Sequence, residues 1–328
     1  MARTRYASDP GLIARMGATM FLMGLLFAGF ATGIVYLVLF YGTHRHGGGG
    51  GTINVDVLVA FAAIIGVGSA VASYYWSDKI ALRTSGARLV NRNDSEDAKR
   101  LHDIVDRICA MANMPKPKVA IAPTQMPNAF ATGRNSNVAV ICATQGILDK
   151  LTNEELEGVL AHEMSHVAHK DVAVMTVASL LGIVAALMVR FAFYSELFGG
   201  GGRGRGGNNN QNGLLIIPIM LLSIVVYAVS FLLIRMLSRY RELSADRSGA
   251  LLTGRPSELA SALVKVTGDM GKIPQRDLRA AEPLNAFYFA PAITARGAQQ
   301  NLAALFSTHP SLDKRLAQLD KIAKQLGQ

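Results

Sequence analysis

Four long apolar segments limit what this chain can fold into more than any other feature of its sequence. They run roughly from Met16 to Tyr41, Val55 to Trp76, Val172 to Phe193 and Leu214 to Leu237. A helix needs about 20 apolar residues to cross the hydrocarbon core of a bilayer, and each segment reaches that length. The first is too long for the apolar part of a signal peptide, and no convincing small-residue cleavage site follows it. Half of the residues are hydrophobic and only 17% are charged, so the sequence predicts a mainly α-helical membrane protein with four transmembrane helices.

Basic residues predict which side of the membrane each part of the chain faces, because Lys and Arg are enriched in cytoplasmic segments. Here they gather before the first apolar segment, after the second and after the fourth: Arg3, Arg5, Arg15, Lys79, Arg83, Arg88, Arg92, Arg235, Arg239 and Arg241. The loops 42–54 and 194–213 carry few of them. We therefore expect a multi-pass protein of the cell inner or plasma membrane, with both termini and the catalytic segments in the cytoplasm.

Charge and composition also narrow the choice of partners. The net charge of +10 suits a surface that lies against the anionic lipids of a bilayer. A nucleic-acid partner is not expected, because the chain has no basic patch interleaved with aromatic residues and no helix-turn-helix pattern. A transporter is disfavoured as well, because no Asp, Glu or His lies deep inside any apolar segment, whereas a translocation path normally contains such residues.

An H-E-x-x-H motif occupies residues 162–166, in a segment whose apolar residues follow helical spacing. His162 and His166 lie on one helix face, about 6 Å apart at Cβ, so both imidazoles can bind one Zn²⁺. Glu163 lies between them, where its carboxylate can take a proton from a metal-bound water. The same five-residue pattern also occurs by chance on surface helices. A third ligand is therefore needed to distinguish a catalytic site.

The segment after the fourth apolar stretch supplies the best candidate for that third ligand. The astacin-like arrangement requires a third His at the position of Val172, so that class is excluded. The thermolysin-like arrangement takes a Glu from a later helix, and Glu242 is the best match. Asp246 follows one turn later and could orient a ligand imidazole. A Glu–Asp pair on a basic helix also occurs on solvated faces with ion pairs, and spacing alone slightly favours that alternative.

Four motifs occur in a fixed order between Asn128 and Arg315. They are Asn128-Ala129-Phe130-Ala131-Thr132-Gly133, the run from His162-Glu163 to Asp171, Arg239-x-x-Glu242-x-x-Ala245-Asp246, and Thr308-His309-Pro310 with Arg315. Together they resemble the N-A-F-A-x-G, H-E-x-x-H-x-x-x-x-D, R-x-x-E-x-x-A-D and H-P-x-x-x-x-x-R motifs of the HtpX-type membrane zinc endopeptidases. The N-terminal third resembles that family mainly in hydropathy.

The resemblance implies a cytoplasmic α+β, zincin-like metalloprotease domain with a small β-sheet, and a role for each polar residue. Metal ligands would be His162, His166 and Glu242, holding one Zn²⁺ per chain. Glu163 would be the general base. His309 would stabilise the oxyanion, with Arg315 as a second candidate, and Asp246 and Asp171 would support the ligands. Substrate would lie extended along Asn128, Ala129, Phe130 and Ala131, or along the strand from Val138 to Cys142, although either could be a plain structural hairpin.

These observations divide the chain into five parts. We expect a cytoplasmic segment at 1–15, a transmembrane hairpin at 16–76, a first protease part at 77–171, a second hairpin at 172–237 with a Gly-rich loop, and a second protease part at 238–328. The first protease part should contain a helix at 94–111 and strands at 118–122 and 137–142. Its two cysteines, in a reducing compartment, are not expected to form a disulfide.

The expected function is that of a zinc endopeptidase acting on misfolded membrane proteins or on cytoplasmic loops, in quality control and stress response as the resemblance implies. Two alternatives remain open. One is a processing peptidase with a narrow choice of substrate. The other is a membrane scaffold that binds zinc without catalysis, although the presence of Glu163 argues against it.

Overall fold

The computed structural model describes residues 10–43, 79–133, 135–199, 210–270 and 309–328, together with isolated positions between 64 and 76. The chain forms two compact units. The first contains residues 1–16, 74–174 and 235–328, and the second contains residues 17–73 and 175–234.

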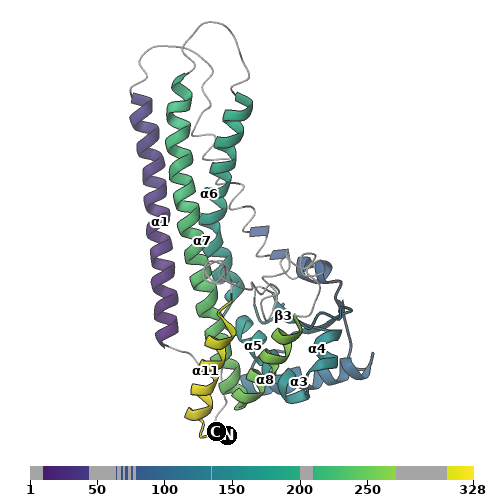
Figure 1. Ribbon diagram of the computed structural model, residues 1–328. Coiled ribbons are helices and arrows are strands. Elements are labelled where there is room, and N and C mark those ends of the chain that lie inside the picture. The colour runs from purple at the N-terminus through teal and green to yellow at the C-terminus, as the bar shows by residue number, and fades with distance from the viewer. Residues whose placement is uncertain are drawn as a thin grey trace. The chain divides into compact units, whose positions relative to one another are not determined.

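Helices α1 (Pro10–Thr43), α6 (Asp171–Gly199) and α7 (Asn210–Thr253) are long and largely apolar (Figure 1). Within the residues that the structure describes, three helices can cross a membrane by length and composition, over Pro10–Leu37, Asp171–Arg190 and Ile217–Thr253. This corrects the predicted number of four for the described part of the chain. The predicted span from Val55 to Trp76 lies almost entirely outside the described residues, and the few described positions within it are helical.

The second unit has its own small core, in which apolar side chains of the three helices meet. Its buried members are Phe30 and Ile34 of α1, Leu181, Ala185 and Met188 of α6, and Ile219 and Val226 of α7. Other large apolar side chains of these helices point outward: Phe21 is 67% exposed and Val177 is 62% exposed. Apolar residues on the outside of a helix bundle are typical of a surface in contact with lipid.

A four-stranded mixed sheet lies in the first unit, with strand order β1-β2-β4-β3. The strands are β1 (Arg88–Leu89), β2 (Lys118–Ala122), β3 (Ala129–Thr132) and β4 (Val140–Thr144). β2 and β4 are parallel, whereas β1 pairs with β2 and β3 pairs with β4 in antiparallel fashion. β3 is therefore an edge strand of the sheet, and β4 is an interior strand.

Two boundaries differ from the sequence prediction for local reasons. The strand expected at 137–142 begins at Val140, because the side chain of Asn135 accepts hydrogen bonds from the backbone of Asn137 and Val138 and holds a turn there. The helix expected at 94–111 is α3 (Glu96–Ala112), because the Ser95 side chain accepts a hydrogen bond from the Ala98 N–H and caps it.

Helix α5 (Asn153–Ala168) is the centre of the first unit. Thr152 and Glu155 form a complete capping box at its start. It packs against β3, α3 and α8 (Pro256–Met270), and α8 packs in turn against α11 (Leu312–Gln325). In Figure 1, α5 lies between the sheet and α8. A short helix, α4 (Gln145–Lys150), follows β4 directly.

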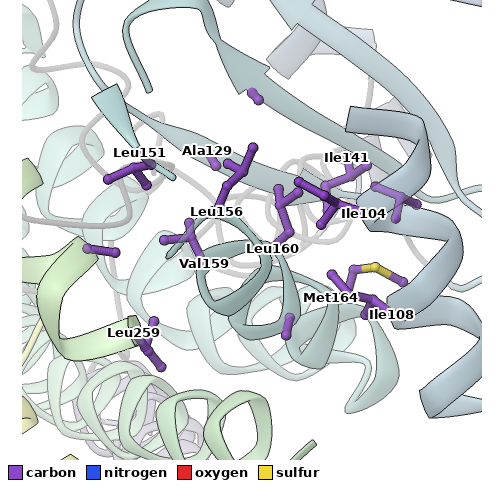
Figure 2. Close-up of a cluster of buried hydrophobic side chains, with 14 of the residues drawn as sticks. Ile104, Ile108, Ala129, Ile141, Leu151, Leu156, Val159, Leu160, Met164 and Leu259 are labelled. Atoms are coloured by element: carbon purple, nitrogen blue, oxygen red, sulfur yellow. The ribbon is translucent and has the colours of Figure 1, made fainter. Parts of the chain in front are cut away.

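The core of the first unit explains why α5 is held in one orientation. Figure 2 shows Leu156 and Leu160 of α5 beside Ala129 and Ile141 of the sheet, with Leu259 of α8 in the same cluster. Each fully buried side chain of this size contributes about 1.5–3 kcal/mol by leaving water. With so much of its surface in the core, α5 presents its polar residues in a fixed direction.

Candidate metal centre

The H-E-x-x-H residues lie in the middle of α5. His162 is fully buried, Glu163 is 6% exposed, and His166 is partly exposed. One helical turn separates the two histidines, and their rings meet edge to face with centroids 4.9 Å apart. The nitrogens of both rings are therefore close enough to bind the same ion.

Glu242 of α7 joins the two histidines. His162 Nε2 lies 3.6 Å from Glu242 Oε2, and His166 Nε2 lies 3.5 Å from Glu242 Oε1. The three residues each offer one donor atom, and these atoms lie within 4.8 Å of one another. The structure thus brings together three residues that are far apart in the sequence.

This donor set fits a divalent metal of the zinc type. Two imidazole nitrogens and one carboxylate oxygen are the ligands of many catalytic zinc sites, which keep a fourth position open. In a tetrahedron with zinc–ligand bonds of 2.0–2.1 Å, neighbouring ligand atoms are about 3.3 Å apart. The separations of 3.5 and 3.6 Å are longer than a good hydrogen bond and close to that value. The geometry is therefore compatible with a metal ion held by these three residues.

A carboxylate lies behind each histidine. His162 Nδ1 is 2.9 Å from Asp246 Oδ1, and His166 Nδ1 is 2.6 Å from Asp171 Oδ2. A ring whose Nδ1–H donates to a carboxylate keeps the lone pair of Nε2 for a metal. Burial alone would lower the pKa of His162, but the carboxylates of Asp246 and Glu242 outweigh it and raise that pKa to about 9.

Two arginines hold these supporting carboxylates. The Arg315 guanidinium donates from Nε and Nη2 to the two oxygens of Asp246, at 2.8 and 2.6 Å. Arg241 Nη2 lies 3.0 Å from Asp171 Oδ2. Arg315 is 1% exposed, so its bidentate ion pair with Asp246 is shielded from water and is strong. Two of the three guanidinium nitrogens thus donate to Asp246.

Glu163 is turned toward the sheet. Its carboxylate accepts a hydrogen bond of 3.3 Å from the backbone N–H of Ala131 in β3. Burial raises the pKa of Glu163, although the nearby histidines oppose the shift. A carboxylate whose pKa lies nearer neutrality can both accept and release a proton during a reaction.

His309 approaches the centre from the start of α11. Its Nδ1 lies 3.0 Å from Glu242 Oε2, and the side chain is buried. The motif at 308–315 therefore contributes two groups with different partners. His309 contacts a residue of the metal group, whereas Arg315 contacts the carboxylate behind it.

The segment expected to bind substrate is β3 and the residue before it. The backbone N–H of Asn128 donates to the hydroxyl oxygen of Thr144 in β4, and that hydroxyl donates to the backbone carbonyl of Asn128. Residues Ala129 to Thr132 pair with β4 along one side. The alternative edge at Val138 to Cys142 is wrong, because β4 lies between β2 and β3 and both of its sides are paired.

Comparison with known proteins identifies the kind of enzyme to which this centre belongs. The sequence model of peptidase family M48 matches residues 95–323. That range contains every residue of the centre described above. The chain belongs to peptidase family M48.

The most similar relatives agree with this family. The chain is 52% identical over 326 residues to "Protease HtpX homolog 1" of Streptomyces coelicolor, covering 99% of this chain and 97% of that protein. It is 44% identical to "Protease HtpX homolog 2" of Methanosarcina acetivorans, covering 99% of each. The crystal structure of Ste24p from S. mikatae aligns with 93% of this chain and 66% of its own, with a TM-score of 0.50 and 18% identity, a likeness of fold.

The resemblance to HtpX-type proteases is confirmed by these relatives. With its apolar helices, this M48 peptidase is a membrane-bound metalloprotease that acts on protein substrates. The structure also adds two residues of the centre that sequence reasoning did not assign to it. In the sequence, Arg241 indicates only membrane topology, and its position beside Glu242 gives no sign of its partner Asp171.

The second overlooked residue is Gly249. A Cβ built on Gly249 would lie 2.9 Å from the backbone N and 3.1 Å from the Cα of His162. Side-chain atoms essentially never come so close to a backbone, so α7 can approach α5 here only because residue 249 has no side chain. Its spacing of two turns from Glu242 on one helix face is a signal that could have suggested this role.

Proposed function

We propose that this M48 peptidase is a zinc-dependent endopeptidase that hydrolyses misfolded membrane proteins at the cytoplasmic side of the cell inner or plasma membrane. One observation carries the proposal: His162 and His166 of α5 converge with Glu242 of α7 at distances suited to one metal ion. Glu163 lies beside them with a raised pKa.

His162, His166 and Glu242 would hold the zinc ion. When bound there, zinc supplies a Lewis acid that lowers the pKa of a water molecule and polarises the scissile carbonyl. Asp246 and Asp171 keep the two imidazoles in position by accepting from Nδ1–H.

Glu163 is the proposed general base. Its carboxylate takes the proton from the attacking water and passes it to the departing amine. Burial raises the pKa of Glu163, and a general base works best when its pKa is moved toward the operating pH. The bond with the Ala131 N–H fixes the carboxylate beside β3.

His309 is the proposed donor to the oxyanion that forms on the substrate carbonyl. Its ring is held near the metal group by Glu242. Arg315 donates to Asp246 with two nitrogens, and we therefore assign it a positioning role, through Asp246 and His162.

The substrate would bind in an extended conformation along Asn128, Ala129, Phe130 and Ala131. Strand β3 is at one end of the sheet and packs against α5. A substrate added there would gain main-chain hydrogen bonds, which provide affinity without demanding a particular sequence. Such binding suits a peptidase that must accept many unfolded segments.

The membrane topology follows from the charge distribution. Residues 77–171 and 238–328 would form one cytoplasmic protease domain, 1–15 a short cytoplasmic segment, and 16–76 and 172–237 two transmembrane hairpins. Glu242 follows the apolar part of its helix within a few residues, so segments of substrates near the membrane surface could reach the site. This placement supports a role in quality control of membrane proteins.

The experiment is cleavage of casein by the full-length protein, purified in detergent and loaded with zinc, beside Glu163→Gln. Glu154→Gln, on the exposed side of the same helix, is the matched control. We expect Glu163→Gln to bind one zinc ion per chain and to lose cleavage by about 10²–10⁴-fold, with Glu154→Gln fully active.

Each other outcome contradicts a part of the proposal. Equal cleavage by Glu163→Gln and the unsubstituted protein would remove Glu163 as the base and indicate a contaminating protease. Zinc binding without any casein cleavage would favour a narrow-specificity processing peptidase or a non-catalytic scaffold. Failure to bind zinc at all would reject the metal site.

A further inference from the structure

A cavity lined by both basic and apolar side chains lies in the first unit, formed by residues other than those of the metal group. Its volume is about 390 Å³, within the range of about 300–1,000 Å³ that is typical of small-molecule sites. The first two turns of α1, the end of α7 and one face of α11 form its walls. Its lining includes Leu12, Arg15, Leu243, Arg247, Lys314 and Lys321.

All the charged residues that line this cavity are basic. Arg15, Arg247, Lys314 and Lys321 come from three different helices, and none of the lining residues is acidic. Of the acids on α11, Asp320 pairs with Lys324 at 2.6 Å, and Asp313 is not among the lining residues. Cations held around one concave space repel one another, and a bound anion relieves that repulsion.

Arg15 and the helix that carries Lys314 and Lys321 are held in position by contacts with α7. The Arg15 guanidinium lies 6.0 Å from the ring centroid of Tyr240, a cation–π contact that holds the start of α1 against α7. On α11, Gln318 lies between the two lysines and donates a hydrogen bond of 2.7 Å to the backbone carbonyl of Leu243. The spacing of Lys314 and Lys321 puts both on the same face of the helix.

The floor of the cavity is apolar, which favours a lipid over a bare anion. Leu12, Leu243 and Ile322 are 7%, 5% and 1% exposed. Arg15 directly precedes the apolar residues of α1, and basic residues at the end of a membrane-spanning helix lie at the depth of the phospholipid headgroups. A phospholipid would offer its phosphate to the cations and the first carbons of its acyl chains to the apolar floor.

We propose that this cavity binds a phosphate-bearing anion, which the membrane supplies as the headgroup of an anionic phospholipid. The binding would also connect the membrane to the metal centre. Arg247 follows Asp246 and Lys314 precedes Arg315, so the cavity adjoins both sides of the ion pair that joins α7 to α11. An anion in contact with both helices would hold them together at this pair.

The test measures lipid binding to the full-length protein in detergent by native mass spectrometry. The probes are dihexanoyl phosphatidylglycerol, the zwitterionic dihexanoyl phosphatidylcholine, and inorganic phosphate. The variant Lys314→Gln/Lys321→Gln removes two cations of the cavity, and Lys99→Gln/Lys118→Gln removes two exposed lysines elsewhere. Arg15→Gln is an independent variant on another helix.

We expect phosphatidylglycerol to bind more tightly than phosphatidylcholine, and its affinity to fall about 30-fold in Lys314→Gln/Lys321→Gln. Arg15→Gln should weaken binding about fivefold, and the control variant should stay within about twofold of the unsubstituted protein. Equal affinity in the cavity variant and the control would overturn the site. Inorganic phosphate binding as tightly as phosphatidylglycerol would overturn the assignment to a lipid headgroup.

Discussion

Gly249→Ala should damage the metal centre without touching any proposed ligand. The added Cβ would lie 2.9 Å from the backbone N of His162, 3.1 Å from its Cα and 3.2 Å from the carbonyl carbon of Ala161. All three atoms belong to the backbone of α5, which cannot rotate away as a side chain can. Helix α7 must therefore move away from α5 by several tenths of an ångström, and Glu242 moves with it.

The magnitude follows from two opposing effects. Overpacking costs about 1–3 kcal/mol, and a clash with backbone atoms, which cannot rotate away, should cost about 2–3 kcal/mol within that range. Ala is preferred to Gly inside a helix by about 0.8–1.0 kcal/mol. The net loss should be about 1–2 kcal/mol, and it should act on the distances between His162, His166 and Glu242. If the whole net loss of free energy opposes metal binding, zinc affinity falls by about 5–30-fold, because 1.4 kcal/mol is a factor of ten in a binding constant.

The assay is competition for zinc between the protein and a chromophoric chelator, with the thermal unfolding midpoint measured in parallel. Gly268→Ala is the matched control, because a Cβ at Gly268 of α8 would meet no atom within 4 Å. That variant should bind zinc normally and unfold at a slightly higher temperature. If Gly249→Ala keeps both the zinc affinity and the unfolding midpoint of the unsubstituted protein, the close approach of α7 to α5 is not a requirement of the site.

Three further predictions test the surroundings of the centre. Asp246→Asn removes the charge that pairs with buried Arg315, so thermal unfolding should show a loss of stability of about 3–5 kcal/mol. Chelator competition should show a fall in zinc affinity of about 10–100-fold, because Asp246 no longer orients His162. Burial alone would raise the pKa of Glu155, but hydrogen bonds donated by Lys265, Ser261 and the backbone of Thr152 outweigh it and lower that pKa. This stabilisation is present above the unfolded pKa and lost as pH falls through the folded one, so Lys265→Gln should move the acid-unfolding midpoint to higher pH, and an unchanged midpoint would contradict it. Burial raises the pKa of the Cys142 thiol to about 12, so iodoacetamide should not label it at pH 8 before unfolding, and rapid labelling in the native state would be the contrary result.

Much of the metal centre was predictable because its signals are local. The H-E-x-x-H spacing, the capping box at Thr152 and the pair Glu242 and Asp246 each depend on residues within one or two helical turns. The one-turn spacing of a helix determines which of these residues share a face. What spacing could not supply was the choice between a metal ligand and a solvated acid for Glu242, because that choice depends on a helix elsewhere in the chain.

Other features depend on contacts between distant segments. No local pattern indicates that β4 lies inside the sheet and β3 at its end, because strand order is decided by which apolar faces pack against α3 and α5. The partner of Arg315 was also not predictable. A guanidinium near a catalytic motif suits either an oxyanion or a carboxylate, and only the packing of α11 brings it to Asp246.

By itself, the sequence determined that this chain enters a membrane and contains a helix whose residue spacing suits metal binding and a general base, because hydrophobic length and helical spacing are properties of short segments. The tertiary structure decided which carboxylate lies beside which histidine, where α7 comes closest to α5 at Gly249 and where four cations share a cavity. Those features arise from close packing between helices, where a shift of a few tenths of an ångström changes the partner of a side chain, and such distances are not encoded in any one segment.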